Sequence, residues 1–486
     1  MPNEVKGLNE ECGLFGIWGS EHAAQLTYDG LHSLQHRGQE GAGIVSNDHG
    51  EFHRQRGLGL LAEVFSDPQK MTTLTGQAAV GHVRYATAGN HGVENIQPML
   101  FDHPQVKQFA LAHNGNLTNA NQLRQELRAQ NVTFQATSDS ELLGELVQVS
   151  NQPDFISQLK AGLNHIRGGF AYIMMTPTAL VAALDPNGFR PLVIGKMDDG
   201  ATIICSETCA LDQVGATFVR DVEPGEVVIV NNHGMTIDHF TTDTHLAICS
   251  MEYIYFARPD SVIRGISVHE ARLRMGANIA KEAPVKADVV IGVPNSSLSA
   301  AIGYAKASGI PYDMGMIKNQ YVARTFIEPT QAKRARGVSM KLSVVKSVVA
   351  GKDIVLVDDS IVRGTTSSYI VRLLKKAGAK SVHVRIASPV LKFPCYYGID
   401  IQTTKELIGA NHTVDEIRDL IGADSLAYLS VDGLVNAIGE LNDTTNHGLC
   451  TAYFDGQYPT PLYDYQAGFD EEVARLGLYE GVQHID

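Results

Sequence analysis

The chain has few cysteines, one tryptophan and no long apolar run. Six cysteines among 486 residues are too sparse for a disulfide scaffold and are typical of a reducing compartment. The longest charge-free apolar stretch, residues 168–184, is interrupted by Thr176, Pro177 and Thr178, and it falls short of the ~20 residues that span a bilayer. The first eleven residues lack the apolar core of a secretory signal. We therefore expect a cytoplasmic protein with no membrane partner.

Positive charge is also scarce. Lys and Arg number 39 against 53 Asp and Glu, which gives a net charge of −14 and disfavours broad contact with nucleic acid or anionic lipid. The hydrophobic share of 44% and the charged share of 19% are those of an ordinary folded protein, and the length predicts two or three folding units. An anionic ligand of this chain therefore requires a local basic cluster.

The two halves of the chain have different patterns. Between Cys12 and about residue 245, short strand-like runs are separated by Gly, Asn and Asp turns, which predicts an α+β domain rich in antiparallel sheet. From about residue 285, apolar strands, including the runs 287–294 and 310–317, alternate with helices, which predicts a parallel α/β sheet. The expected division is a leading segment over 1–11, a first domain over 12–245, a second over 246–470 and a tail over 471–486.

The clearest strand and helix lie between residues 353 and 388. Residues 354–357 form a continuous apolar run, as expected of a parallel strand buried on both faces. After a loop, apolar residues recur at helical spacing from Ile370, with Thr365 or Thr366 as the N-cap and Gly378 as the stop. The loop between them lies at the carboxyl edge of the sheet, where open α/β sheets bind ligands.

This loop combines two carboxylates with features that bind anions. Asp358 and Asp359 suit sugar hydroxyls or a divalent cation, whereas the amides of the following helix N-terminus favour a phosphate. The residues expected at the phosphate are Arg363, Gly364, Thr365, Thr366 and Ser367. An isolated Asp pair commonly only caps a turn, but the whole run 355–367 has matching chemistry. It resembles the ribose-phosphate motif of type I phosphoribosyltransferases, which bind 5-phosphoribosyl 1-diphosphate (PRPP) with Mg²⁺.

Two further segments fit the diphosphate of PRPP. Residues 318–341 contain six cations and one carboxylate; such a run is often only a solvated loop, but here it can fold over the diphosphate and exclude water, with Lys341 as a PRPP contact. In the turn 293–299, Ser296 and Ser297 open a helix, and we expect Ser296 to join Asp358 and Asp359 around Mg²⁺. The neighbouring Asn295 stands where relatives commonly carry Asp.

Five motifs of the first half have an order and spacing that together carry a second resemblance. They begin at Cys12 and continue at residues 35–43, 81–89, 112–119 and 137–143. A lone buried cysteine is usually a small hydrophobe, but this series resembles the glutaminase domain of class II amidotransferases, the N-terminal nucleophile hydrolases. The resemblance implies that residues 1–11 are a propeptide whose removal makes Cys12 the first residue.

The resemblance also implies the roles of the remaining glutaminase residues. A thiol of ordinary pKa ~8.5 needs a base, and the freed α-amine of Cys12, with a pKa of ~7.7 to 8.0, can serve. Arg84 would bind the α-carboxylate of glutamine and Asp139 its α-ammonium. The side chain of Asn114 and the backbone amide of Gly115 would form the oxyanion hole.

Together the two resemblances imply a pentosyltransferase that carries glutamine-derived ammonia to PRPP and yields 5-phosphoribosylamine, glutamate and diphosphate, the first committed step of purine biosynthesis. They also imply a homotetramer inhibited by purine nucleotides. Two alternatives are a glutaminase that feeds another ammonia acceptor and a catalytically silent, PRPP-sensing regulator. The loop 358–367 argues against the first alternative, and the lack of a basic DNA-binding domain argues against the second.

One cysteine set departs from the pattern of the relatives. Relatives with a propeptide often hold a [4Fe-4S] cluster on four cysteines, and Cys249, Cys395 and Cys450 match three of those positions. The fourth position is Tyr453, and tyrosine is a poor substitute for a thiolate at such clusters. We therefore expect no cluster, with a labile cluster on three cysteines as the alternative.

Overall fold

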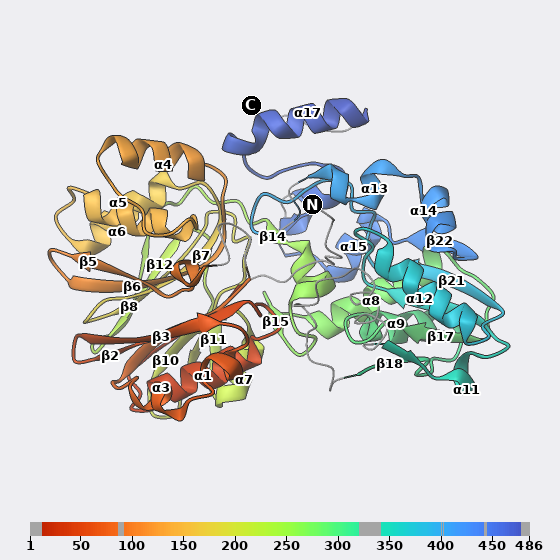
Figure 1. Cartoon of the computed structure of the whole chain (residues 1–486), viewed down its shortest axis with the longest axis horizontal. Coiled ribbons are helices and arrows are strands. Elements are labelled where there is room, and N and C mark those ends of the chain that lie inside the picture. The colour runs from red at the N-terminus through yellow and green to blue at the C-terminus, as the bar shows by residue number, and fades with distance from the viewer. Residues whose placement is uncertain are drawn as a thin grey trace.

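The computed structural model describes residues 12–85, 92–319, 342–399, 401, 403–441 and 445–477. These residues form two lobes, one from the first half of the chain and one from the second (Figure 1). The first lobe contains antiparallel sheets with helices, and the second contains a parallel sheet. The predicted fold class is therefore confirmed.

Two antiparallel sheets pack face to face in the first lobe. Alternating side chains explain this packing, because Leu14 and Trp18 point into the core between the sheets whereas Phe15 and Ile17 point to the helices outside. One sheet has the order β11 (Thr217–Asp221), β9 (Val193–Lys196), β10 (Thr202–Cys205), β1 (Gly13–Trp18), β4 (Ala78–Arg84), β2 (Gly41–Asp48) and β3 (Glu51–Leu58). The other has the order β13 (Gly234–His239), β12 (Glu226–Asn231), β8 (Leu180–Leu184), β7 (Gly168–Met175), β6 (Lys107–Leu117) and β5 (Met99–His103).

Helices cover the outer faces of both sheets, so that this lobe has four layers (Figure 1). Below the first sheet in this view lie α1 (Ala23–Ser33) and α7 (Thr208–Val214). Above the second sheet lie α4 (Ala120–Ala129), α5 (Ser140–Val149) and α6 (Phe155–His165). Shorter elements are α2 (Leu61–Val64), α3 (Pro68–Thr72) and η1 (Val93–Asn95).

The second lobe is built on a four-stranded parallel sheet. Its strand order is β17 (Val289–Gly292), β20 (Asp353–Asp358), β21 (Ser381–Ile386) and β22 (Ser425–Tyr428). One face packs on α12 (Thr365–Lys376) and α14 (Val414–Ile421), and the other on α8 (Val268–Glu282), α9 (Leu298–Ser308) and α15 (Val431–Ile438). The central part of β20, residues 354–357, is apolar because both faces of the sheet are covered.

Two local predictions are corrected by the structure. Residues 310–317 are not a strand of the parallel sheet; only Tyr312 makes a single bridge to Val290, because Pro311 has no amide to donate to a ladder. Residues Met316–Lys318 (β18) instead pair antiparallel with β19 (Leu342–Val344). Helix α12 begins with Thr365 itself, and its N-cap is Gly364 at φ +74°, so neither threonine is the cap.

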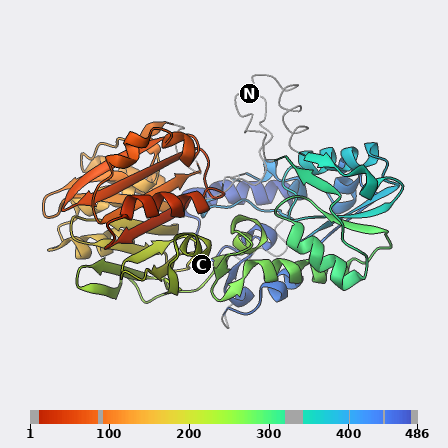
Figure 2. The same ribbon diagram turned by 90° about the horizontal axis from the view of Figure 1, so that it is seen from below.

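The remaining elements are short, apart from the C-terminal helix α17. They are β14 (Ile248–Cys249), η2 (Glu252–Phe256), β15 (Val262–Ile263), β16 (Ile266–Ser267), α11 (Lys346–Val349), η3 (Thr404–Glu406), α13 (Ile408–Asn411), η4 (Thr445–Gly448), β23 (Leu449–Cys450), α16 (Ala452–Asp455), η5 (Tyr463–Tyr465) and α17 (Gln466–Leu476). The dark blue helices near the C-terminus lie along the junction of the lobes (Figure 2). No helix in the described part of the chain is long and apolar enough to cross a membrane.

Candidate active sites

Cys12 lies at the start of the first sheet. It directly precedes β1, which runs beside β4 with Gly13 opposite Val83, so Cys12 and Arg84 lie at the same edge of the sheet. The side chain of Cys12 is buried, and its Sγ is 3.4 Å from the carbonyl oxygen of Tyr85. The structure therefore brings the predicted nucleophile and the predicted carboxylate-binding arginine together.

Asn114 and Gly115 lie in β6 of the other sheet. The Asn114 side chain is 1% exposed, and its Nδ2 has no hydrogen-bond partner among the residues that the structure describes. Gly115 has φ +146°, and a Cβ there would lie 2.0 Å from the carbonyl oxygen of Gly169, so no other residue fits. A buried amide donor that is left without a partner is suited to a developing oxyanion.

Hydrogen bonds connect β4 with β6 and hold Asp139 beside β6. His82 of β4 places Nε2 3.2 Å from the carbonyl oxygen of His113 in β6. Burial lowers the pKa of His82 to about 3, so its ring is neutral at neutral pH. The Asp139 Oδ2 accepts a 2.9 Å hydrogen bond from the Leu117 amide. The five predicted glutaminase residues thus lie on neighbouring segments.

The second candidate site lies at the carboxyl end of β20. Ser297, at the start of α9, donates a 2.9 Å hydrogen bond to Asp358 Oδ1, and Ser296 donates to Asp359 Oδ2. Burial raises the pKa of Asp358 well above its usual range, with repulsion from Asp359 as the next cause, and burial also raises the pKa of Asp359. The predicted set of Ser296, Asp358 and Asp359 is therefore brought together as a group of oxygen donors in which both carboxylates are buried and the serine is half-buried.

The N-terminus of α12 opens beside this carboxylate pair. Thr365 and Thr366 are exposed, whereas Ser367 is buried. Gly364 needs its left-handed conformation, and a Cβ there would lie 2.8 Å from Ile408 Cδ1. Arg363 forms an ion pair with Glu406 of η3. Lys341 and nearly all of the predicted basic segment lie outside the described residues, between β18 and β19.

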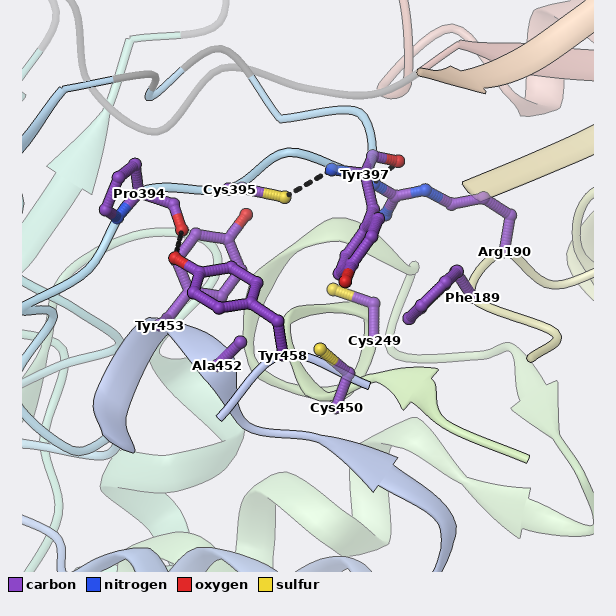
Figure 3. A pocket seen from close by; sticks show the side chains of 10 residues that line it. All are labelled: Phe189, Arg190, Cys249, Pro394, Cys395, Tyr397, Cys450, Ala452, Tyr453 and Tyr458. Atoms are coloured by element: carbon purple, nitrogen blue, oxygen red, sulfur yellow. Dashed lines mark hydrogen bonds between the residues drawn. The ribbon is translucent and has the colours of Figure 1, made fainter. Parts of the chain in front are cut away.

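The four positions compared with an iron–sulfur ligand set line one pocket between the lobes (Figure 3). Cys249 of β14 is directly opposite Cys450 of β23, and Tyr453 follows on α16. Large side chains fill the remaining space: Phe189, Tyr397, Tyr453 and Tyr458. The free volume of about 10 Å³ is near the lower limit for a single water molecule. No group of three or more His, Cys, Asp or Glu side chains within the described ranges could hold a metal ion.

A buried ion cluster between the lobes was not predicted. Arg37 Nη1 lies 2.6 Å from Glu207 Oε1, and Arg37 Nη2 lies 2.7 Å from Glu252 Oε1. Burial by itself would raise the pKa of the Glu207 carboxyl, but His36 and Arg37 hold that pKa well below its usual range. These side chains are 170 and 215 positions apart in the chain, and no local pattern indicates that they meet.

Comparison with known proteins agrees with this geometry. A glutamine amidotransferase domain matches residues 82–213, and a phosphoribosyl transferase domain matches residues 272–400. The chain is therefore an enzyme that joins a glutamine amidotransferase to a pentosyltransferase. It is 58% identical to amidophosphoribosyltransferase of Staphylococcus aureus (strain MRSA252), over 96% of this chain and 94% of that protein. It is 56% identical to that of Bacillus subtilis (strain 168), over 95% and 97%. The chain belongs to the amidophosphoribosyltransferase family.

Two solved structures are similar over nearly the whole chain. One is glutamine phosphoribosylpyrophosphate amidotransferase from B. subtilis complexed with ADP and GMP; it has a TM-score of 0.89 and 54% identity, and the match covers 94% of this chain and 100% of that one. The other, the allosteric regulatory enzyme of purine biosynthesis, also has a TM-score of 0.89, with 56% identity over 93% of this chain and 97% of that one.

Proposed function

We propose that this enzyme transfers glutamine-derived ammonia to PRPP and releases 5-phosphoribosylamine, glutamate and diphosphate, as the first committed step of purine biosynthesis. The proposal is carried by two features of one chain: the buried Nδ2 of Asn114, which has no hydrogen-bond partner among the described residues, and a carboxylate pair beside the N-terminus of α12. Membership of the amidophosphoribosyltransferase family supports it.

In the glutaminase reaction, Cys12 is the nucleophile. Its Sγ attacks the side-chain carbonyl carbon of glutamine, and the thiol proton passes to the α-amine that removal of residues 1–11 frees. Nδ2 of Asn114 and the amide of Gly115 bind the oxyanion. The C–N bond then breaks, ammonia leaves with the proton, and water hydrolyses the thioester to glutamate. Arg84 and Asp139 hold the two charged groups of the amino acid.

In the transferase reaction, the amides of α12 with Thr365, Thr366 and Ser367 bind the 5-phosphate, and Arg363 and Lys341 contribute cationic contacts. Asp358 and Asp359 would bind the ribose hydroxyls and, with Ser296, would hold Mg²⁺. This donor set fits Mg²⁺, which commonly takes one or two carboxylates together with substrate phosphate oxygens. When bound there, Mg²⁺ would neutralise charge on the departing diphosphate. Ammonia displaces diphosphate at carbon 1.

The domain division and the regulation follow the same proposal. Residues 12–245 would form the glutaminase domain, residues 246–470 the phosphoribosyltransferase domain and residues 471–486 a tail; the end of β13 at His239 and the start of β14 at Ile248 support the first boundary. We also propose inhibition by purine nucleotides, which the ADP and GMP complex of the B. subtilis relative supports, and assembly as a homotetramer, which light scattering would test.

Steady-state kinetics tests the reaction. With PRPP and Mg²⁺, the enzyme should release diphosphate when supplied with either glutamine or ammonia. Glutamate production without diphosphate would favour a glutaminase that feeds another acceptor, whereas PRPP binding without either product would favour a regulator. Intact mass should show the loss of residues 1–11, and an uncut chain should use ammonia but not glutamine.

We propose that the pocket around Cys249, Cys395 and Cys450 holds no [4Fe-4S] cluster. Tyr453 stands at the position of the fourth thiolate, and tyrosine is a poor substitute for a thiolate at such clusters. Protein purified without oxygen should contain no stoichiometric iron or sulfide, and Tyr453→Cys provides the comparison with a complete cysteine set. Stoichiometric iron and sulfide in the unchanged protein would refute this proposal.

A further inference from the structure

One guanidinium connects the nucleophile of the first lobe to the second lobe. Nε of Arg37 donates a 3.2 Å hydrogen bond to the carbonyl oxygen of Cys12. On its other side, Nη1 and Nη2 donate to the two oxygens of Glu252 at 3.0 Å and 2.7 Å. The side chains of Arg37 and Glu252 are fully buried, so solvent does not weaken this bidentate pair.

Glu252 is itself held by residues of the second lobe. It opens η2, and Arg272 of α8 donates from Nε to the Tyr253 carbonyl at 2.7 Å and from Nη2 to the Ala257 carbonyl at 2.8 Å. The segment that carries Glu252 is therefore fixed by α8, which also packs against the parallel sheet. The position of the Glu252 carboxylate is thus set by the phosphoribosyltransferase half of the chain.

The same half also supports the oxyanion strand. Arg190 donates from Nη2 to the carbonyl oxygen of Tyr397 at 2.8 Å, and its Nη1 lies 3.8 Å from Glu252. The next residue, Gly398, packs so closely that a Cβ there would lie 3.1 Å from the Cα of Gly115. Both the nucleophile and the oxyanion glycine are therefore backed by the second lobe.

We propose that Glu252, a residue of the phosphoribosyltransferase half, is a positioning residue of the glutaminase site: through Arg37 it fixes the backbone of Cys12. The inference rests on the proposed role of Cys12 as the nucleophile. Once residues 1–11 are removed, Cys12 is a chain terminus, and termini are poorly ordered unless they are tied down. The hydrogen bond to its carbonyl then determines where both Sγ and the α-amine point.

Glu252→Gln tests the proposal, because the carboxamide keeps the shape of the side chain but turns one acceptor into a donor that faces Arg37. A displacement of about 1 Å at a reacting group can lower a rate on the order of 10²-fold. We expect the glutamine-dependent kcat to fall by about that factor, with little change in the KM for glutamine and with ammonia-dependent synthesis retained. If Glu252→Gln does not fold, Glu252→Asp, which shortens the reach to Arg37, carries the same expectation.

Glu226→Gln is the matched control. Glu226 is also buried, and its carboxylate pairs with Arg220 at 2.8 Å within the first lobe, but it contacts none of the proposed catalytic residues; its glutamine-dependent kcat should not change. Equal losses of glutamine-dependent and ammonia-dependent activity in the Glu252 variant, or no loss of either, would overturn the inference. Cys12→Ala separates the two proposals: if it abolishes glutamine use while Glu252→Gln does not impair it, only the positioning role fails.

Discussion

Asn114→Ala should impair glutamine use selectively, because it removes a donor that the fold itself does not use. Nδ2 of Asn114 is buried and has no hydrogen-bond partner in the described ranges. Loss of one oxyanion-hole donor typically costs about 2.7 to 4 kcal/mol of transition-state stabilisation, or about 10² to 10³ in kcat. We expect a decrease of that size in glutamine-dependent kcat and retention of ammonia-dependent synthesis.

Asn119→Ala is the control for Asn114→Ala, because the Asn119 side chain has a structural role. The Asn119 side chain donates to the His165 carbonyl at 3.0 Å and accepts from the Arg167 amide at 2.9 Å. Two such bonds contribute about 1 to 3 kcal/mol together, so this variant should lose stability yet keep the ratio of glutamine-dependent to ammonia-dependent kcat. Asn114→Ala should show the opposite combination, with a melting temperature near that of the parent.

The assay compares the two nitrogen sources at saturating PRPP and Mg²⁺ and follows diphosphate release. Thermal unfolding of each variant is measured on the same preparations. A glutamine-dependent kcat of Asn114→Ala within threefold of the parent would refute the oxyanion-hole assignment. Parallel losses with glutamine and ammonia would show that the substitution damages the protein as a whole.

Three further substitutions test other parts of the account. Asp358→Asn should lower diphosphate release with glutamine and with ammonia alike. It should also weaken Mg²⁺-dependent PRPP binding on the order of tenfold or more. Unchanged PRPP binding in a calorimetric titration would contradict the assignment. Gly364→Ala should cost roughly 1 to 2 kcal/mol in unfolding free energy because of its φ of +74°, and the KM for PRPP should rise; parent-like stability would count against the strain. Burial lowers the pKa of His82 to about 3 in the folded protein. As the pH falls below about 6.5, the unfolded chain therefore gains a proton at His82 that the folded chain does not. The folded state then loses about 1.4 kcal/mol of stability per pH unit. In urea titrations His82→Asn should lose stability less steeply between about pH 6.5 and 4, and an equal slope would exclude this cause.

Local patterns predicted the elements that carry the second site. The apolar run 354–357 and the helical spacing from Ile370 depend on near neighbours, and both were confirmed as β20 and α12. The predicted N-cap of α12, Thr365 or Thr366, was wrong because a left-handed Gly364 can cap a helix without a side-chain hydrogen bond. The strand predicted over 310–317 was wrong because the prediction weighed only the apolar pattern, whereas Pro311 has no amide to donate to a ladder and only Tyr312 bridges to the sheet.

The contacts between the lobes could not be predicted from local patterns. Arg37 lies in the motif at residues 35–43, yet this motif does not indicate that its arginine pairs with Glu252, 215 positions later in the chain. The close approach of Gly398 to Gly115 depends on how the two lobes pack against each other. Each lobe has its own apolar core, so apolar patterns predict the cores but not this contact. Such pairings are properties of the tertiary structure rather than of residue periodicity.

The central claim is that the sulfur of Cys12 releases the ammonia that the PRPP site consumes. The direct measurement is 5-phosphoribosylamine synthesis after stoichiometric labelling of Cys12 with a glutamine-mimicking alkylator, with glutamine and ammonia compared on the same sample. Synthesis from glutamine should disappear while synthesis from ammonia persists. Unchanged synthesis from glutamine by fully labelled enzyme would contradict the account.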